Sequence, residues 1–157
     1  MSHSTAAGLL QGAGLRVTTA RVAVLETLRD HPHADAGEVL RLTREHAKGV
    51  SVQGVYDVLT TLSSAGLLRR IQPAQSHAAR FELDLGDNHH HAVCRSCQAL
   101  VDIPCSVGTI PCAEPDQPAA AGFLVDEAEV IYWGMCPRCQ EEAGELPHTP
   151  ASSGTSA

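Results

Sequence analysis

Two pairs of cysteines, each with two residues between its members, constrain this chain more than any other feature. Cys94 and Cys97 form the first pair, in the run CRSC, and Cys136 and Cys139 form the second, in the run CPRC. Two such pairs supply the four thiolates of a tetrahedral zinc site, which is closed to other ligands. We therefore expect a structural Zn(II) ion that holds the second half of the chain together.

The same cysteines allow two other interpretations. A pair of disulfides suits a secreted protein, but the first 20 residues lack the apolar segment of a signal peptide. A thioredoxin-like redox motif is disfavoured by the presence of two copies and by the absence of a βαβ pattern. Zinc is therefore favoured, and it would join strands expected near residues 92–103 and 129–135, where EVIYWGM is typical of a buried strand.

Two further cysteines, Cys105 and Cys112, lie in the run IPCSVGTIPCAEP and do not form a C-x-x-C pair. We expect them to be loop thiols rather than zinc ligands. If they come within disulfide distance of each other, they would form a secondary redox pair.

A run of three histidines in FELDLGDNHHHAV is a second candidate metal site. In an extended strand His89 and His91 point to one face and His90 to the other, so alternate imidazoles can converge on one ion. Further candidate ligands elsewhere in the chain are His31, Glu82 and Asp102. Imidazoles with carboxylates suit Fe(II), Mn(II), Ni(II) or Zn(II). The alternative is that the histidines simply form a solvated strand end.

Three segments of the first half have the apolar spacing of helices. We expect helices over residues 18–31, 35–47 and 51–65, with N-caps at Thr18, Asp35 and Ser51. The side chains expected to face a common core are Val22, Leu25, Leu28, Val39, Leu42, Val55, Leu59 and Leu62. Strand-like segments follow at residues 67–72 and 79–83, and three helices with a hairpin are typical of a winged helix.

The third of these helices has a small, polar outer side that includes Gln53, Tyr56 and Asp57. A recognition helix presents such residues to base edges. The candidate phosphate contacts are Arg16, Arg21, Arg69 and Arg70. On pattern alone, an ordinary small helical domain with solvated charges fits equally well.

The charges are divided unevenly along the 157 residues, whose formal net charge is -7. Residues 1–80 contain nine Lys and Arg against six Asp and Glu, whereas residues 81–157 contain two against twelve. Any nucleic acid would therefore bind the first half. Because no apolar run of about 18 residues occurs, we expect a cytoplasmic protein that does not contact a membrane.

Taken together, the motifs resemble the ferric uptake regulator family of metal-dependent transcriptional repressors over roughly residues 8–140. The matching runs, in order, are GLRVTTAR, HPHAD, SVQGVYDVLTTLSSAGLLRRI, RFE, NHHHAVCRSC, LVD and YWGMCPRC. The resemblance implies an α+β chain that is not an enzyme. It implies a winged-helix DNA-binding domain over residues 1–84, a small α/β dimerisation domain with the four-cysteine zinc site over residues 85–140, and a flexible tail over residues 141–157.

The resemblance also implies where the functional residues lie. It places the structural zinc on the four paired cysteines, and a regulatory ion, Fe(II) or Mn(II) with Ni(II) or Zn(II) as alternatives, on His31, Glu82, His89, His91 and Asp102. It implies a homodimer on a palindromic operator in double-stranded DNA. The DNA-binding residues that it implies are Arg16, Arg21, Ser51, Gln53 and Tyr56.

Within the family, the chain is most similar to the peroxide-sensing branch that regulates catalase-peroxidase genes, and Cys105 and Cys112 are part of that likeness. In such a sensor, iron-catalysed oxidation of a ligand, here His31 or His89, releases the repressor from DNA. The alternative is a reversible iron, manganese or nickel regulator. Glu82 bears on this choice, because the best-known peroxide sensors have Asp at that position and iron sensors have Glu. A zinc hydrolase is disfavoured, because four thiolates leave no position for water.

Overall fold

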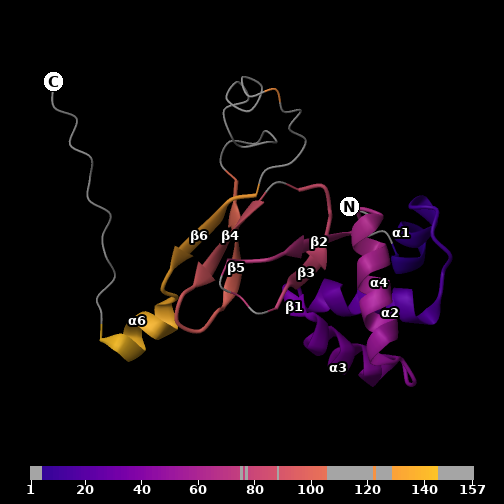
Figure 1. Cartoon of the computed structure of the whole chain (residues 1–157), viewed down its shortest axis with the longest axis horizontal. Helices are drawn as coiled ribbons and strands as arrows, with labels where there is room; N and C mark the ends of the chain where they lie inside the picture. The colour runs from indigo at the N-terminus through magenta and orange to yellow at the C-terminus, as the bar shows by residue number, and fades with distance from the viewer. Residues whose placement is uncertain are drawn as a thin grey trace. The chain divides into compact units, whose positions relative to one another are not determined.

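The computed structural model describes residues 5–74, 76, 78–87, 89–105, 122 and 129–144. The chain divides into two compact units, Met1–Asp87 and Asn88–Ala157. The first unit combines helices with a small sheet, and the described part of the second contains a sheet and a helix (Figure 1). The predicted α+β class is therefore confirmed. None of the helices in the described ranges is both long and apolar enough to cross a membrane.

The first unit contains the three predicted helices and a short one before them: α1 (Ala6–Gly12), α2 (Thr19–Asp30), α3 (Ala36–His46) and α4 (Val52–Ser64). The predicted N-caps of α2, α3 and α4 are confirmed. The side chains of Thr18, Asp35 and Ser51 each accept a hydrogen bond from the backbone N–H three residues further on. Of these four helices, only α1 was not predicted. It has seven residues, and only Ala6 and Leu10 among them are buried, which is too few to show a helical pattern in the sequence.

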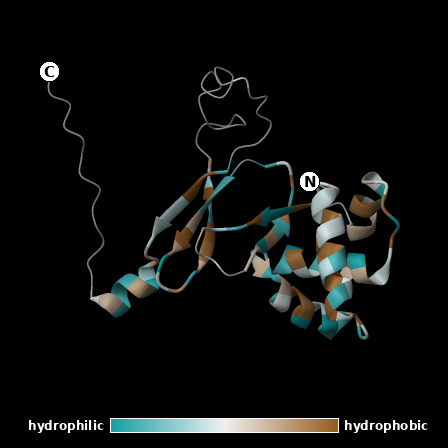
Figure 2. Ribbon diagram, viewed as in Figure 1, coloured by the Kyte–Doolittle hydropathy of each residue, from teal (hydrophilic) through white to brown (hydrophobic). Residues whose placement is uncertain are grey.

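The helices enclose an aliphatic core that also includes Leu68 and Phe81 from the sheet. Figure 2 shows hydrophobic and hydrophilic segments alternating around these helices, as expected when one face of each is buried. The predicted inward side chains of α3 and α4 are buried. On α2 the prediction needs one correction: Val24 is fully buried and Val22 only partly, so the buried stripe runs through Val24, Leu25 and Leu28.

The sheet of the first unit has the strand order β1-β3-β2. The hairpin strands β2 (Leu68–Ile71) and β3 (Arg80–Leu83) confirm the two predicted segments. They pair in antiparallel register, with Arg69 opposite Glu82. The third strand, β1 (Ala34–Asp35), has only two residues and pairs with β3 on its other side. It was not predicted, because two residues carry no alternating pattern.

The described part of the second unit contains the strands β4 (His89–Cys94), β5 (Leu100–Pro104) and β6 (Ile131–Gly134), in the order β5-β4-β6. β5 is antiparallel to β4 and β6 is parallel to it. The helix α6 (Pro137–Ala143) follows, so residues 141–143 of the expected tail are helical. The remainder of that tail, from residue 145, lies outside the described residues.

The strand predicted in EVIYWGM is confirmed as β6, but its expected burial is wrong. Tyr132 is 51% exposed, while Ile131 and Trp133 are partly buried. The strand stands at the end of the order β5-β4-β6, so among the described residues it has a neighbouring strand on one side only. An edge strand exposes both backbone and side chains.

Candidate metal centres

The four paired cysteines come together in the second unit. Cys94 ends β4, Cys97 lies in the turn that follows, Cys136 is the N-cap of α6 and Cys139 lies within α6. The parallel pairing of β4 with β6 places the end of β4 beside the start of α6, since Cys94 is opposite Gly134. The four sulfur atoms lie within 4.8 Å of one another, and Cys94 and Cys139 are buried.

The spacing of the sulfur atoms fits a tetrahedral zinc ion. Zinc–sulfur bonds of about 2.3 Å place tetrahedral ligands about 3.8 Å apart. The Sγ atoms of Cys97 and Cys136 are 3.6 Å apart. The backbone N–H of Cys136, at the start of α6, donates a hydrogen bond to Sγ of Cys94 at 3.3 Å. These donors fit a closed structural zinc site.

The surroundings of Cys94 and Cys97 favour the thiolate form of these two side chains. Backbone N–H groups of Cys97 and Cys136 lower the pKa of Cys94 to about 6. A backbone hydrogen bond from Ala99 likewise lowers the pKa of Cys97. For Cys139, a side-chain hydrogen bond from Ser96 lowers the pKa, but the neighbouring sulfur atoms and burial outweigh it and raise the pKa to about 11. One cation among the four sulfurs would stabilise all of them as thiolates.

Contacts other than those among the cysteines also stabilise the turn that follows β4. Gln98 adopts a left-handed backbone conformation, with φ of 60°, and its N–H donates to the carbonyl of Cys94 at 3.0 Å. The guanidinium of Arg95 lies over the ring of Trp133, 5.4 Å from its centroid. The backbone N–H of Arg95 also donates to the carbonyl of Gly134 at 2.8 Å. These contacts tie the turn after β4 to the end of β6.

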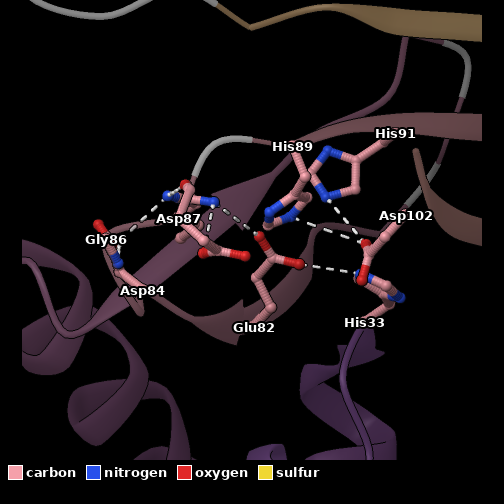
Figure 3. A network of polar contacts seen from close by, with 9 residues as sticks. His33, Glu82, Asp84, Gly86, Asp87, His89, His91 and Asp102 are labelled. Carbon is pink, nitrogen blue, oxygen red and sulfur yellow. Dashed lines mark hydrogen bonds and ion pairs between the residues drawn. The ribbon is translucent and has the colours of Figure 1, made fainter. Parts of the chain in front are cut away.

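In the first unit, the imidazole of His33 lies against the carboxylate of Glu82, and both residues are labelled in Figure 3. Nε2 of His33 is 2.9 Å from Oε2 of Glu82. Glu82 is only 4% exposed. Its second oxygen, Oε1, lies 3.7 Å from Nη1 of Arg69. A buried carboxylate requires such partners, or a metal ion, to offset the loss of water.

The structure brings His33, and not the predicted ligand His31, to Glu82. His31 is exposed at the C-terminal end of α2, where its N–H donates to the carbonyl of Thr27. His33 precedes β1, and its own N–H donates to the carbonyl of Phe81, the residue next to Glu82 on β3. It also adopts a left-handed φ of 65°, a strained conformation of the kind often found at functional sites. Of the two histidines in this run, His33 is therefore the one that lies beside Glu82, and the assignment of His31 as a metal ligand stays a prediction.

In the second unit, two imidazoles face one carboxylate. Nε2 of His89 is 3.7 Å and Nε2 of His91 is 3.6 Å from the same oxygen, Oδ1 of Asp102. Asp102 is opposite His91 in the β4–β5 register, so the predicted alternation of the histidines is confirmed. His90 lies on the other side of the strand, where its ring contacts Tyr132 at 6.1 Å between centroids.

These separations are slightly longer than those expected between ligands that share one divalent ion. Nitrogen and oxygen ligands about 2.1 Å from one ion lie about 3.0 to 3.5 Å apart, depending on the coordination geometry. The two imidazole rings stand edge to face with centroids 4.9 Å apart. In Figure 3, dashed lines join Nε2 of each ring to the carboxylate of Asp102. The donors in each unit are imidazole and carboxylate groups, whereas those of the zinc cluster are all thiols.

The predicted DNA-binding residues all lie in the first unit. Tyr56 is 52% exposed on α4, and the amide of Gln53 donates to the carboxylate of Asp57 at 2.8 Å. The hydroxyl of Ser51 caps α4. Arg21 donates from Nη1 to the carbonyl of Arg16 at 2.8 Å. The carboxylate of Asp57 therefore lies beside Gln53 and puts a negative charge on the outer face of α4.

A cavity of about 700 Å³ lies between α4 and the hairpin. Tyr56 and Thr60 line it from α4, and Arg70 and Gln72 line it from the hairpin side. The guanidinium of Arg70 donates to the side chain of Gln72, and both are exposed. Arg69 points elsewhere, to acidic groups of its own unit, so it is not placed as the phosphate contact suggested by the sequence.

Of the two remaining cysteines, Cys105 is described by the structure and is not part of the four-cysteine cluster. Cys105 follows β5 and is partly buried. Cys112 lies outside the described residues, so the predicted redox pair stays a prediction.

Comparison with known proteins gives one consistent result. Residues 12–114 match the sequence pattern of the ferric uptake regulator family. The chain is 54% identical over 130 residues to the transcriptional regulator FurA of Mycobacterium tuberculosis, covering 83% of this chain and 86% of that protein.

Solved structures of the same kind share the fold. The ferric uptake regulator of Vibrio cholerae has a TM-score of 0.66 and 25% identity, over 83% of this chain and 98% of that one. The ferric uptake regulator of Pseudomonas aeruginosa with manganese has a TM-score of 0.65 and 27% identity, over 84% and 98%.

Proposed function

The chain belongs to the ferric uptake regulator family, and from this premise we propose that it is a peroxide-responsive, metal-dependent repressor that binds DNA as a homodimer. The family supplies the general function of a metal-dependent transcriptional regulator. The paired donor sets described above support a regulatory ion distinct from the proposed structural zinc, and we propose no enzymatic activity.

We propose His33 and Glu82, together with His89, His91 and Asp102, as the ligands of one regulatory ion. The supporting observation is that each group already converges within its own unit: 2.9 Å from His33 to Glu82, and 3.6 to 3.7 Å from the two β4 imidazoles to Asp102. Imidazole and carboxylate ligands suit Fe(II) and Mn(II), with Ni(II) and Zn(II) as alternatives.

The first unit is the proposed DNA-binding domain, of winged-helix type. Its support is the exposed outer side of α4, which carries Tyr56 and Gln53, and the adjoining hairpin with the exposed Arg70. We propose that Arg16, Arg21 and Ser51, at or near the starts of α2 and α4, contact the phosphate backbone of the DNA. A dimer would present two such units to the halves of a palindromic operator.

The second unit is the proposed dimerisation domain. β5 and β6 lie at the two ends of the order β5-β4-β6, and Val101 and Tyr132 on them are more than half exposed. A strand edge and exposed apolar side chains are features that a second copy can cover. Burial of the side chains of β6 is accordingly expected in the dimer.

A shared ion would act as a switch by favouring one arrangement of the two units. If the ion binds the DNA-competent arrangement about 100-fold more tightly than the other, it supplies about 2.7 kcal/mol per subunit. That is enough to change operator occupancy without unfolding either unit. Metal-bound protein would then repress, and loss of a ligand would release the DNA.

For the peroxide response, bound Fe(II) would activate hydrogen peroxide at the site, and in the net reaction the two electrons that reduce the peroxide would come from the oxidised imidazole. A ligand imidazole would gain one oxygen atom at a ring carbon, with water as the other product, and would bind metal less well. His89 and His33 are the proposed targets, with His31 kept as the candidate from the sequence. The second candidate function is a reversible metal regulator, which Glu82 favours.

Two experiments test these proposals. His89→Ala should lower Mn(II) affinity at least tenfold and abolish metal-dependent operator binding, while His90→Ala, on the other side of β4, should leave Mn(II) affinity within about twofold. Equal effects of the two changes would contradict the ligand assignment.

The second experiment is peptide mass spectrometry of Fe(II)-loaded protein before and after brief exposure to peroxide. One added oxygen on the His89 or His33 peptide, with loss of operator binding, supports the peroxide sensor. Release of DNA on chelation but not on peroxide treatment would establish the reversible regulator instead.

A further inference from the structure

Arg69 stands at the centre of an acidic cluster that the proposed metal site does not explain. Its guanidinium reaches three carboxylate side chains of the first unit, those of Glu82, Asp84 and Asp87. Arg69 is directly opposite Glu82 in the β2–β3 register, so the two side chains share one face of the sheet. The side chain of Arg69 is 23% exposed.

The contacts of Arg69 differ in length in an informative way. Nη2 donates to the backbone carbonyl of Asp87 at 2.6 Å and lies 3.2 Å from Oδ1 of Asp84. By contrast, Nη1 is 3.7 Å from Oε1 of Glu82, well beyond the usual 2.7 to 2.9 Å of a charge-assisted hydrogen bond. Arg69 is therefore anchored by the segment 84–87 and only loosely held by Glu82.

The anchoring segment has its own internal support. The carboxylate of Asp84 accepts a hydrogen bond from the backbone N–H of Gly86 at 3.0 Å, a contact shown in Figure 3. Gly86 has a left-handed φ of 70°. This turn ends the first unit and leads, in sequence, to β4 and its histidines. It keeps a permanent positive charge near Glu82 at every pH of interest, since a guanidinium does not deprotonate.

We propose that Arg69 is a positioning residue that sets the metal affinity of the regulatory site. Its guanidinium competes with the ion for the charge of Glu82, and it stays on Asp84 and Asp87 when the ion takes that carboxylate. The proposal rests on the assignment of Glu82 as a ligand. Its consequence is that the site binds metal more weakly than its own ligands would allow, which suits a site that must release its ion.

The test compares Mn(II) affinity, measured by calorimetry on zinc-loaded protein, in Arg69→Gln and Arg70→Gln. The two changes remove the same charge from neighbouring positions, but Arg70 is exposed and bound to Gln72. We expect Arg69→Gln to raise Mn(II) affinity about tenfold, because the guanidinium then no longer competes with the ion for the charge of Glu82, and Arg70→Gln to change it less than twofold. Unchanged or weaker binding by Arg69→Gln overturns the proposal.

Hydrogen exchange of the metal-free protein provides a second readout. Arg69→Gln should speed amide exchange within residues 84–87, because the contact with the carbonyl of Asp87 is lost, and Arg70→Gln should not. Faster exchange without tighter Mn(II) binding would reduce Arg69 to a structural brace and overturn the proposal.

A second variant, Asp84→Asn, removes a negative charge and tests the proposal even if Arg69→Gln fails to fold. Asp84→Asn frees Arg69 to move towards Glu82, so it should weaken Mn(II) binding about threefold or more, whereas Asp57→Asn, on α4, should not. Equal affinities of the two variants overturn the proposal.

Glu82→Gln separates this proposal from the one on which it rests. If Glu82→Gln leaves Mn(II) affinity unchanged, the regulatory site itself is misassigned and both proposals fail. If Glu82→Gln weakens binding but Arg69→Gln has no effect, only the role of Arg69 fails.

Discussion

Replacing Cys97 with serine should unfold the second unit while the first unit stays folded. The Sγ atom of Cys97 is 3.6 Å from that of Cys136, so this residue joins the turn after β4 to the start of α6. A serine hydroxyl does not ionise near neutral pH and is a poor zinc ligand. The variant therefore loses one of four ligands and, with it, the connection between β4 and α6.

The expected size of the effect follows from what else holds that unit together. Among its described residues, Val93 is the only buried aliphatic side chain, and burial of such a side chain contributes about 2 kcal/mol. A structural zinc ion contributes about 10 to 16 kcal/mol at neutral pH. The first unit, in contrast, buries an extended aliphatic cluster that is independent of metal. A zinc ion on the four cysteines would thus contribute more stability than the buried aliphatic side chain that the structure describes in the second unit.

Site-resolved hydrogen exchange by NMR distinguishes the two units. In Cys97→Ser the amides of β4 and β6 should lose protection, while those of α2 and α4 keep it, and bound zinc should fall well below one ion per chain. Cys105→Ser, which changes a cysteine outside the cluster, should behave as the unchanged protein does. Retained zinc and protected β6 amides in Cys97→Ser would refute the reasoning.

Three further changes test other parts of the structure. His33→Ala should lower Mn(II) affinity at least tenfold and His31→Ala less than twofold, because only His33 contacts Glu82; calorimetry showing the reverse order would restore His31 as the ligand. Leu59→Ala should destabilise the first unit by about 3 kcal/mol in urea unfolding, since this side chain is 1% exposed. Asp57→Asn should tighten operator binding about fivefold in a fluorescence titration, by removing a negative charge beside Gln53; weaker binding would show that Asp57 supports the contact.

The helices of the first unit could be predicted because their signals are local. Thr18, Asp35 and Ser51 cap helices through hydrogen bonds that span three residues, and the apolar spacing that follows each cap is visible in the sequence. The cysteine pairs are equally local, and the ligand chemistry of four thiols leaves few alternatives. Features that depend on residues a few positions apart could therefore be predicted from the sequence.

The proposed regulatory ligands depend on pairing between distant segments, and for them the sequence was a weaker guide. His31 and His33 lie in the same run, HPHAD, and differ only in their relation to β1. That strand has two residues and exists because Ala34 pairs with Phe81, a residue far along the chain. The hydrogen bond from His33 to Phe81 is what selects one histidine over the other. A search for a residue able to pair beside the RFE segment would have pointed to it.

The role of charged side chains was the least accessible feature. Arg69 and Arg70 are adjacent in sequence, yet the alternation of β2 turns one towards the acidic cluster and leaves the other exposed beside α4. Gln53 was expected to face DNA, but its amide is engaged by Asp57 four residues along the helix. Counting charges indicates which half of the chain DNA would bind. Which charged side chains face the DNA depends on strand register and on helix phase.

The separation of sulfur from nitrogen and oxygen donors follows from two requirements that one site cannot meet. An ion that holds a unit together must not leave when a signal arrives, and four thiolates in a closed shell meet that need. A regulatory ion must exchange, so it requires harder ligands, and Arg69 beside Glu82 would weaken its hold further. The thiolates all belong to the second unit, whereas the proposed regulatory ligands come from both units of the chain. In a reversible regulator, loss of the regulatory ion would release the operator without unfolding either unit, and the protein could bind DNA again once metal returned, whereas oxidation of a ligand histidine would prevent that return.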